Sequence, residues 1–180
     1  VPGVEKMPWP AVFKYIEKFA IDLGGISGSL GMQDERVAFF TQDKKFAAGP
    51  IVCYESVYGE YVGEYVKKGA NFLAIITNDG WWGDTPGYKQ HLQYGALRAI
   101  ETRRSIVRSA NTGISATINQ KGEIENKTLW WKEAALKTSV NVNSKITFYT
   151  RFGDYLGLLA IFTSIAIVVS LMIKSSKFSY

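Results

Sequence analysis

Short apolar runs alternate with turn residues along residues 37–119, and this pattern predicts alternating strands and helices. Two such runs, 37–41 and 46–48, flank the polar residues 42–45, which is typical of a β-hairpin. A third run, 51–54, is entered through Gly49-Pro50 and predicts a short strand.

Two segments have the spacing of helices. Residues 57–66 repeat apolar side chains at i, i+1, i+4 and i+5, and this repeat predicts a helix. Lys67-Lys68 suit the negative end of its dipole, and Gly69 can provide a left-handed stop. A second helix is predicted over about residues 88–104, with small and apolar residues on one face.

Between and after these helices the strand pattern returns. Residues 71–77 are a continuous apolar run, as in buried parallel strands, and Asn78-Asp79-Gly80 breaks it. Residues 105–110 and 114–119 predict two more strands, so the succession is that of an α/β layer architecture. Residues 24–31 have the composition of a flexible loop and lack the GxGxxG spacing of a dinucleotide site.

The chain changes character at its end. Residues 155–173 contain no charged side chain, and as a helix they span roughly 28 Å, close to the hydrocarbon thickness of a bilayer. A buried core helix is the alternative, but such helices are usually shorter and have a polar face. We therefore expect a domain over residues 1–150, a transmembrane helix over 155–173 and a short tail over 174–180.

The charges beside this segment predict its orientation. Lys174 and Lys177 follow it, whereas Arg151 on the other side is offset by Asp154. The positive-inside rule then places the tail in the cytoplasm and residues 1–150 outside.

Composition limits the chemistry. The chain is 47% hydrophobic, which allows a real core, and its net charge of +5 comes from scattered lysines and arginines. Scattered charge argues against nucleic-acid binding and fits a weak attraction to anionic lipid headgroups. One cysteine and one histidine exclude an internal disulfide and a multi-thiolate metal site. No cofactor is expected, so any chemistry must rest on Cys53 and carboxylates.

Cys53 ends a predicted buried strand just before a helix, where a turn exposes one side chain and helix amides stabilise a thiolate. The alternative is a small buried hydrophobe. Glu55 either caps the helix or orients groups in a site. His91 could pair with Cys53 as in thiol proteases, but no Asn or Asp is obviously placed to orient it. Packing near the start of its own helix is the favoured interpretation.

Other candidate residues have two interpretations each. Trp81 and Trp82 could line an acyl pocket or fill the core beneath a turn. Arg108 could meet a phospholipid headgroup in a substrate pocket, or it could be solvated or form a structural ion pair.

Several ordered sequence blocks allow comparison with a known family. Residues 50–55 read Pro-Ile-Val-Cys-Tyr-Glu, and residues 77–84 read Thr-Asn-Asp-Gly-Trp-Trp-Gly-Asp. Residues 90–93, 98–101 and 108–113 continue the order. These blocks, together with Val-Pro-Gly-Val-Glu at 1–5 and the apolar tail, resemble the nitrilase superfamily, specifically its apolipoprotein N-acyltransferase branch.

The resemblance implies a partial nitrilase-like αββα sandwich followed by one C-terminal transmembrane helix. It also implies a thiol acyltransferase of the bacterial inner membrane, with its catalytic domain on the periplasmic side. Such an enzyme takes an acyl chain from a phospholipid as a cysteine thioester. It then passes the chain to the N-terminal diacylglyceryl-cysteine of an apolipoprotein.

The same resemblance assigns roles to residues. Cys53 is the nucleophile, Tyr54 and Glu55 are its active-site neighbours, and Glu5 matches an additional active-site glutamate. The family's general base, a glutamate, and its oxyanion-stabilising lysine would both precede Val1, and Lys6 lies in the wrong place to replace the lysine. We therefore expect a C-terminal fragment that is catalytically incomplete by itself. A membrane-tethered amidohydrolase of the same superfamily and a non-enzymatic lipid-binding domain are the alternatives.

Overall fold

A single sheet organises the computed structural model, which describes residues 33–177 of the chain. Its strands follow in the order β1-β2-β3-β4-β5-β6, with β2, β3 and β4 parallel and the other neighbours antiparallel. The strands are β1 (Phe39–Phe40), β2 (Ala47–Val52), β3 (Phe72–Asn78), β4 (Ile106–Asn111), β5 (Ala116–Ile118) and β6 (Ile124–Glu125).

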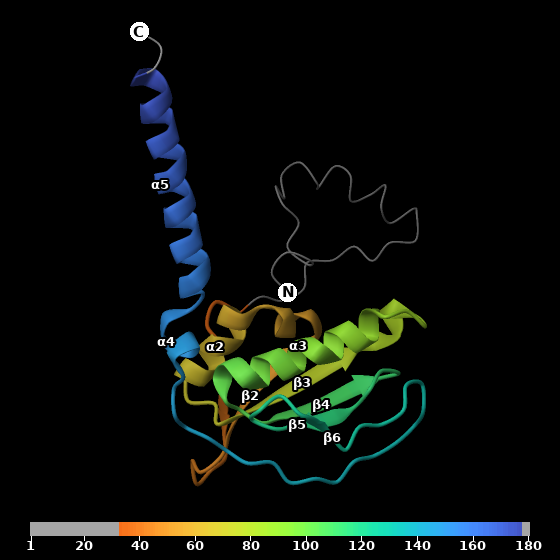
Figure 1. The fold of residues 1–180 in the computed structure, drawn as a ribbon. Helices are drawn as coiled ribbons and strands as arrows, with labels where there is room; N and C mark the ends of the chain where they lie inside the picture. Colours follow the sequence, from red (N-terminus) through yellow and green to blue (C-terminus); the bar gives the residue numbers. More distant parts are fainter. Residues whose placement is uncertain (1–32, 178–180) are drawn as a thin grey trace, which may run out of the picture.

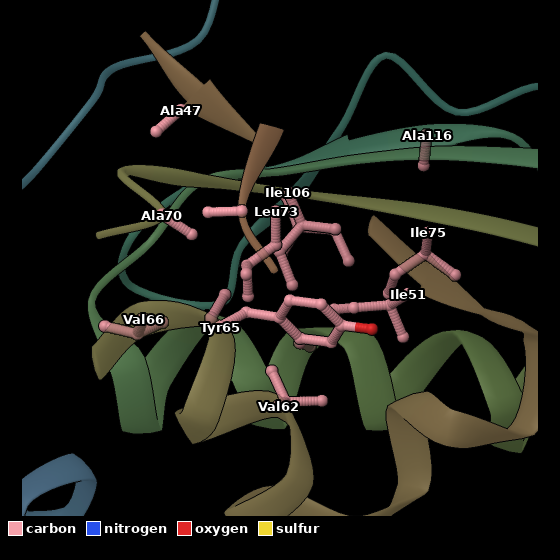
Figure 2. Close-up of a cluster of buried hydrophobic side chains, with 14 of the residues drawn as sticks. Ala47, Ile51, Val62, Tyr65, Val66, Ala70, Leu73, Ile75, Ile106 and Ala116 are labelled. Atoms are coloured by element: carbon pink, nitrogen blue, oxygen red, sulfur yellow. The ribbon is translucent and has the colours of Figure 1, made fainter. Parts of the chain in front are cut away.

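Two helices connect the parallel strands and cover one face of the sheet (Figure 1). Helix α2 (Gly59–Lys67) joins β2 to β3, and α3 (Gly87–Thr102) joins β3 to β4. Apolar side chains from alternate strand positions meet the helices in one buried cluster. Figure 2 shows part of it, with Val62 and Tyr65 of α2 against Ile51, Leu73 and Ile75.

The predicted α/β succession is confirmed, with shifted boundaries. The strand expected at 51–54 spans Ala47–Val52 instead, and Cys53 and Tyr54 belong to a short 3-10 helix, η1 (Cys53–Val57). Pro50 is tolerated in this strand because β1 pairs only with Ala47 and Ala48, which leaves β2 an edge at Pro50. A second 3-10 helix, η2 (Asp79–Trp82), follows β3 at the predicted break.

The second face of the sheet carries apolar side chains that the described residues leave exposed. Val52 is 54% and Ile76 is 59% exposed, although both lie in neighbouring parallel strands. An αββα sandwich has two sheets and two helix layers, and residues 33–177 contribute one of each. The sequence features assigned to residues 1–6 and 24–31 lie outside the described residues.

Two helices end the described part of the chain. Residues 126–147 form neither helix nor strand and lead to α4 (Phe148–Phe152), which is followed by α5 (Tyr155–Lys177). Helix α5 extends away from the sheet in Figure 1. The span Tyr155–Lys174 has a mean hydropathy of 2.6, and it is not buried against the rest of the described structure. Its length and composition therefore suit a membrane crossing.

Candidate active site around Cys53

Cys53 has an unusual backbone at the carboxyl end of β2. Its φ is +51°, in the left-handed region that residues other than glycine rarely adopt, and such strain costs on the order of 1–3 kcal/mol. Its carbonyl oxygen accepts a hydrogen bond from Ser56 Oγ at 2.9 Å and lies 3.2 Å from His91 Nε2. The strained turn is therefore held by side chains of η1 and α3.

The sulfur of Cys53 contacts a buried hydroxyl. Thr77 Oγ1 lies 3.2 Å from Cys53 Sγ and also 3.2 Å from Asp79 Oδ1. Thr77 belongs to the helix-facing side of β3, and its strand pairs with the strand that ends at Val52. The carboxyl ends of two parallel strands thus bring the thiol and the hydroxyl together.

Asp79 is fully buried and is the centre of a polar network. Its Oδ1 lies 2.9 Å from His91 Nδ1, and its Oδ2 accepts from Arg108 Nη2 at 2.8 Å. Burial alone would raise the pKa of Asp79, but hydrogen bonds and charge from His91 and Arg108 outweigh it and hold that pKa below its usual value. The carboxylate is therefore ionised when the protein is folded at neutral pH.

A glycine makes room for this carboxylate. A Cβ atom at Gly113 would lie 2.3 Å from Asp79 Oδ2 and 2.6 Å from Asp79 Cβ. The turn between β4 and β5 can approach Asp79 only because residue 113 has no side chain. Arg108 donates its second amino group to the Ile114 carbonyl at 2.5 Å, which fixes the same turn.

Glu55 has local partners for both carboxylate oxygens. Oε2 accepts from the Val52 amide at 2.7 Å, and Oε1 accepts from the Tyr61 hydroxyl. Burial, followed by the hydrogen bond to Glu55, raises the pKa of Tyr61, so this phenol stays a donor. Of the two roles expected for Glu55, capping of η1 is the one that these contacts describe.

Aromatic rings surround the polar network. The Tyr54 ring lies 6.5 Å from the Trp82 ring and 6.1 Å from the His91 ring, measured between centroids. Trp82 is 36% exposed, whereas Trp81 is 74% exposed. Trp82 therefore borders the site, and Trp81 faces solvent in the described structure.

Tyr54 and Glu55 follow Cys53 in η1, and the Trp82 ring lies beside that of Tyr54. Arg108 is buried in an ion pair, which is the structural alternative, and Glu5 lies outside the described residues. The expectation that no Asn or Asp is placed to orient His91 is wrong, because Asp79 lies 2.9 Å from His91 Nδ1. Thr77 and Ser56 were not predicted as site residues. The sequence does carry one signal for Thr77, because Leu73, Ile75 and Thr77 occupy alternate positions on one face of β3 and Thr77 ends that face with a hydroxyl.

A surface cleft opens beside the carboxyl end of β4. It has a volume of about 340 Å³, and its lining includes Asn111, Thr112, Gly113, Trp131, Lys132 and Glu133. Gly113 is also the residue that contacts Asp79, so the cleft and the buried network share the β4–β5 turn.

Comparisons with known proteins agree with this geometry. The carbon-nitrogen hydrolase family model matches residues 4–145. Proteins named apolipoprotein N-acyltransferase are similar to the chain: that of Chlorobaculum tepidum is 36% identical and that of Geobacter metallireducens 32% identical, each over 86% of the chain. The chain spans only 29% and 28% of the lengths of these two relatives.

A solved structure supports the fold. The carbon-nitrogen hydrolase of Helicobacter pylori G27 superimposes with a TM-score of 0.52 over 58% of this chain and 43% of that protein. Its sequence identity is 16%, so the likeness concerns the fold alone. The nitrilase-like α/β architecture expected from the sequence is confirmed.

Proposed function

Because the chain belongs to the carbon-nitrogen hydrolase family, we propose that it carries the nucleophile of a membrane-bound acyltransferase that N-acylates apolipoproteins. The proposal rests mainly on the geometry of Cys53. The residue occupies a strained turn at the carboxyl end of a parallel strand, with a buried hydroxyl 3.2 Å from its sulfur. Strained backbone of this kind clusters at active sites, and it persists only where surrounding contacts maintain it.

The reaction that suits this site is a two-step acyl transfer. The Cys53 sulfur attacks the ester carbonyl of a phospholipid, a thioester forms, and the lysophospholipid leaves as an alcohol that takes up the thiol proton through a general base. The α-amine of the acceptor's N-terminal diacylglyceryl-cysteine then attacks the thioester. An amide bond forms, the carbon–sulfur bond breaks, and the amine proton returns to the thiol.

The C-terminal helix supports a membrane location. Two residues separate α4 from α5, and α4 packs on α2 of the same domain that carries Cys53. A crossing at α5 would keep the domain beside the bilayer that supplies the acyl donor. We propose a catalytic domain over residues 1–150 on the periplasmic side of the bacterial inner membrane, with residues 174–180 in the cytoplasm.

Further residues take roles consistent with this reaction. The Tyr54 and Trp82 rings lie beside each other and beside His91, and they would supply apolar surface for an acyl chain. Glu5 is proposed as an additional active-site carboxylate on the sequence resemblance alone.

A covalent intermediate tests the proposal. We would join this chain to the preceding part of the Chlorobaculum tepidum relative and incubate the chimera with phospholipid but no amine acceptor. We expect one acyl group on Cys53, seen as a mass increase in the Cys53 peptide and removed by neutral hydroxylamine. Apolipoprotein added afterwards should discharge it.

Two variants make the experiment specific. Cys53→Ala should remove the adduct, and Cys53→Ser should abolish productive transfer because a hydroxyl ionises too weakly to replace the thiolate. Ser139→Ala, at an exposed position outside the sheet, serves as the control and should behave like the wild type. An adduct that persists in Cys53→Ala would place the nucleophile elsewhere. Rapid hydrolysis that apolipoprotein does not affect would favour the amidohydrolase alternative.

A further inference from the structure

We infer that Asp79 is a positioning residue that holds Cys53 at two points, its sulfur through Thr77 and its carbonyl through His91. The inference rests on the proposed function, because it concerns the geometry of the proposed nucleophile. Both branches begin at the same carboxylate oxygen, since Thr77 Oγ1 and His91 Nδ1 lie 3.2 Å and 2.9 Å from Asp79 Oδ1.

The sulfur branch depends on one proton. The Thr77 hydroxyl has a single hydrogen but two acceptors, Cys53 Sγ and Asp79 Oδ1. When Cys53 is a thiol, its S–H can donate to Thr77 Oγ1 while the hydroxyl donates to Asp79. When Cys53 is a thiolate it can no longer donate, and the hydroxyl can turn and donate to the sulfur, because Asp79 keeps its hydrogen bonds from His91 and Arg108 when the Thr77 hydroxyl turns away. Thr77 therefore stabilises the reactive form directly.

The carbonyl branch maintains the strained backbone. Asp79 only accepts hydrogen bonds when ionised, so His91 Nδ1 donates to it and the imidazole ring is fixed in orientation. Nε2 then faces Ser56 Oγ, 3.1 Å away, and the Cys53 carbonyl, 3.2 Å away; it accepts from Ser56 when the ring is neutral, and it donates to the carbonyl when the ring carries its second proton beside Asp79. These contacts hold the carbonyl of a residue with φ of +51°, which would relax to a common conformation without them.

Asp79 can hold both branches because its own position is fixed. Arg108 neutralises the carboxylate from β4, and the missing side chain of Gly113 leaves space for it. Several charged or titratable groups face the cysteine or its hydrogen-bond partners and contribute to its electrostatic environment. They are Tyr54 and Glu55 from η1, Tyr58 between η1 and α2, Tyr61 from α2, Asp79 from η2, His91 from α3 and Arg108 from β4.

The experiment uses the fact that Cys53 is the only cysteine of the chain. Alkylation of the detergent-solubilised protein by iodoacetamide, followed by intact mass, therefore reports on one thiol. The rate is measured from pH 5 to pH 10, and the midpoint of the profile reports the pH at which the thiolate forms. No lipid or acceptor is required.

Thr77→Val should raise this midpoint by about one pH unit, because the thiolate loses a hydrogen-bond donor. Alkylation near pH 7 then becomes about tenfold slower. Thr77→Ser restores the hydroxyl and should return the midpoint to the wild-type value. Thr117→Val, at another buried threonine of the same sheet, is the matched control and should leave the midpoint unchanged.

Asp79→Asn tests the direction in which the alkylation midpoint shifts. It removes a negative charge near the sulfur and leaves Arg108, so the midpoint should fall, opposite to the effect of Thr77→Val. In the chimera, Cys53 acylation should nevertheless slow about tenfold or more, because the nucleophile is ionised but no longer held. If Asp79→Asn does not fold, the two Thr77 variants still decide the sulfur branch.

Three results would overturn the inference. They are a Thr77→Val profile equal to that of Thr117→Val, a Thr77→Ser profile equal to that of Thr77→Val, and an Asp79→Asn midpoint that rises. Failure of the proposed function looks different. If no acyl adduct forms but the alkylation midpoints shift as expected, Asp79 still positions Cys53 and the assigned reaction is wrong.

Discussion

Arg104 and Arg108 are both buried, and their charges are compensated in different ways. Arg108 pairs with the Asp79 carboxylate at 2.8 Å. Arg104 donates instead to the carbonyls of Ala70, Thr102 and Lys145, at 2.8–3.0 Å. Burial lowers the pKa of Arg104 to about 10, which still leaves it charged at neutral pH. One arginine thus serves the site, and the other ties residues 126–147 to the sheet.

Asp79 gives the domain an acid-sensitive stability. Its folded-state pKa is below the unfolded value of 3.8, so its stabilising contribution is complete above that value and is lost as pH falls through the folded pKa. We expect urea unfolding measured from about pH 5 down to about pH 2 to show this loss, and Asp79→Asn to lack that part of it. Asp79→Asn should also cost about 3–5 kcal/mol at neutral pH, because Arg108 loses its partner.

Asp43 provides the control for this measurement. Hydrogen bonds from Thr41 and the Lys45 amide also lower its pKa, but it lies on the surface in the β1–β2 turn. Asp43→Asn should leave the pH dependence close to that of the wild type. An acid loss that is equally large in Asp79→Asn and the wild type would contradict the buried ion pair as its source.

Sequence reasoning at the residue scale singled out Cys53 as the candidate nucleophile but missed the residues that contact it. Cys53, Tyr54 and Glu55 are consecutive, and their position at a strand end is visible in the sequence pattern. Thr77, Asp79, His91 and Arg108 come from four different elements and meet only after β3, β4 and α3 pack. A polar residue ending an otherwise apolar strand face, as Thr77 does, is the one local signal of such a network.

At the element scale, α4 connects the domain to the apolar helix by packing on α2. Thr147 Oγ1 donates to the Glu101 carbonyl of α3 at 2.6 Å, and the Asp154 amide donates to Glu60 of α2 at 3.1 Å. Both hydrogen bonds cross between elements far apart in sequence. The position of α5 therefore depends on the contact between α2 and α4.

Gly59 and Gly63, one helical turn apart on α2, offer a matched test of this contact. A Cβ at Gly59 would lie 2.5 Å from the Tyr149 hydroxyl and 3.0 Å from Glu101 Oε2, whereas a Cβ at Gly63 would meet Thr150 at an ordinary 3.9 Å. Gly63→Ala should stabilise the domain by about 1 kcal/mol through helix propensity. Gly59→Ala should cost about 1–3 kcal/mol through overpacking.

Urea or thermal unfolding of the two alanine variants measures the difference. Equal stabilities for both variants would mean that Tyr149 does not pack on Gly59 in solution. Limited proteolysis provides a second readout, because Gly59→Ala should expose the 148–152 segment to cleavage before the rest of the domain unfolds.

Element types were predictable from the sequence, whereas several ends were not. The apolar run 71–77 and the helical repeat 57–66 match β3 and α2 within two residues at each end. Gly69 does stop α2 with a φ of +102°. The predicted start of the strand at 51 was wrong because Gly49-Pro50 resembles a turn in sequence. In the structure the strand runs through both residues, because β1 pairs only with Ala47 and Ala48 and Pro50 therefore needs no backbone N–H toward β1.

At the scale of the whole molecule, the apolar helix α5 and the site around Cys53 lie on the same side of the sheet. Helix α5 leaves the domain on the side of the sheet that carries α2 and α3, as Figure 1 shows. Cys53 lies on that same side, since η1 contacts both of these helices. A bilayer crossed by α5 would therefore lie beyond the helix layer, not beyond the second face of the sheet.

The orientation of this crossing is the last prediction. Lys174 and Lys177 follow the apolar span, whereas Arg151 and Asp154 before it cancel, so the domain should lie outside the cytoplasm. We would place single cysteines at Lys121, which is exposed in the β5–β6 turn, and after Tyr180, in a cysteine-free form of the chimera. In intact spheroplasts, a membrane-impermeant maleimide should label Lys121→Cys and not the cysteine after Tyr180. Both should label after permeabilisation. The reverse pattern would put Cys53 on the cytoplasmic side, away from any periplasmic acceptor, and a label at both positions before permeabilisation would mean that α5 does not cross the membrane.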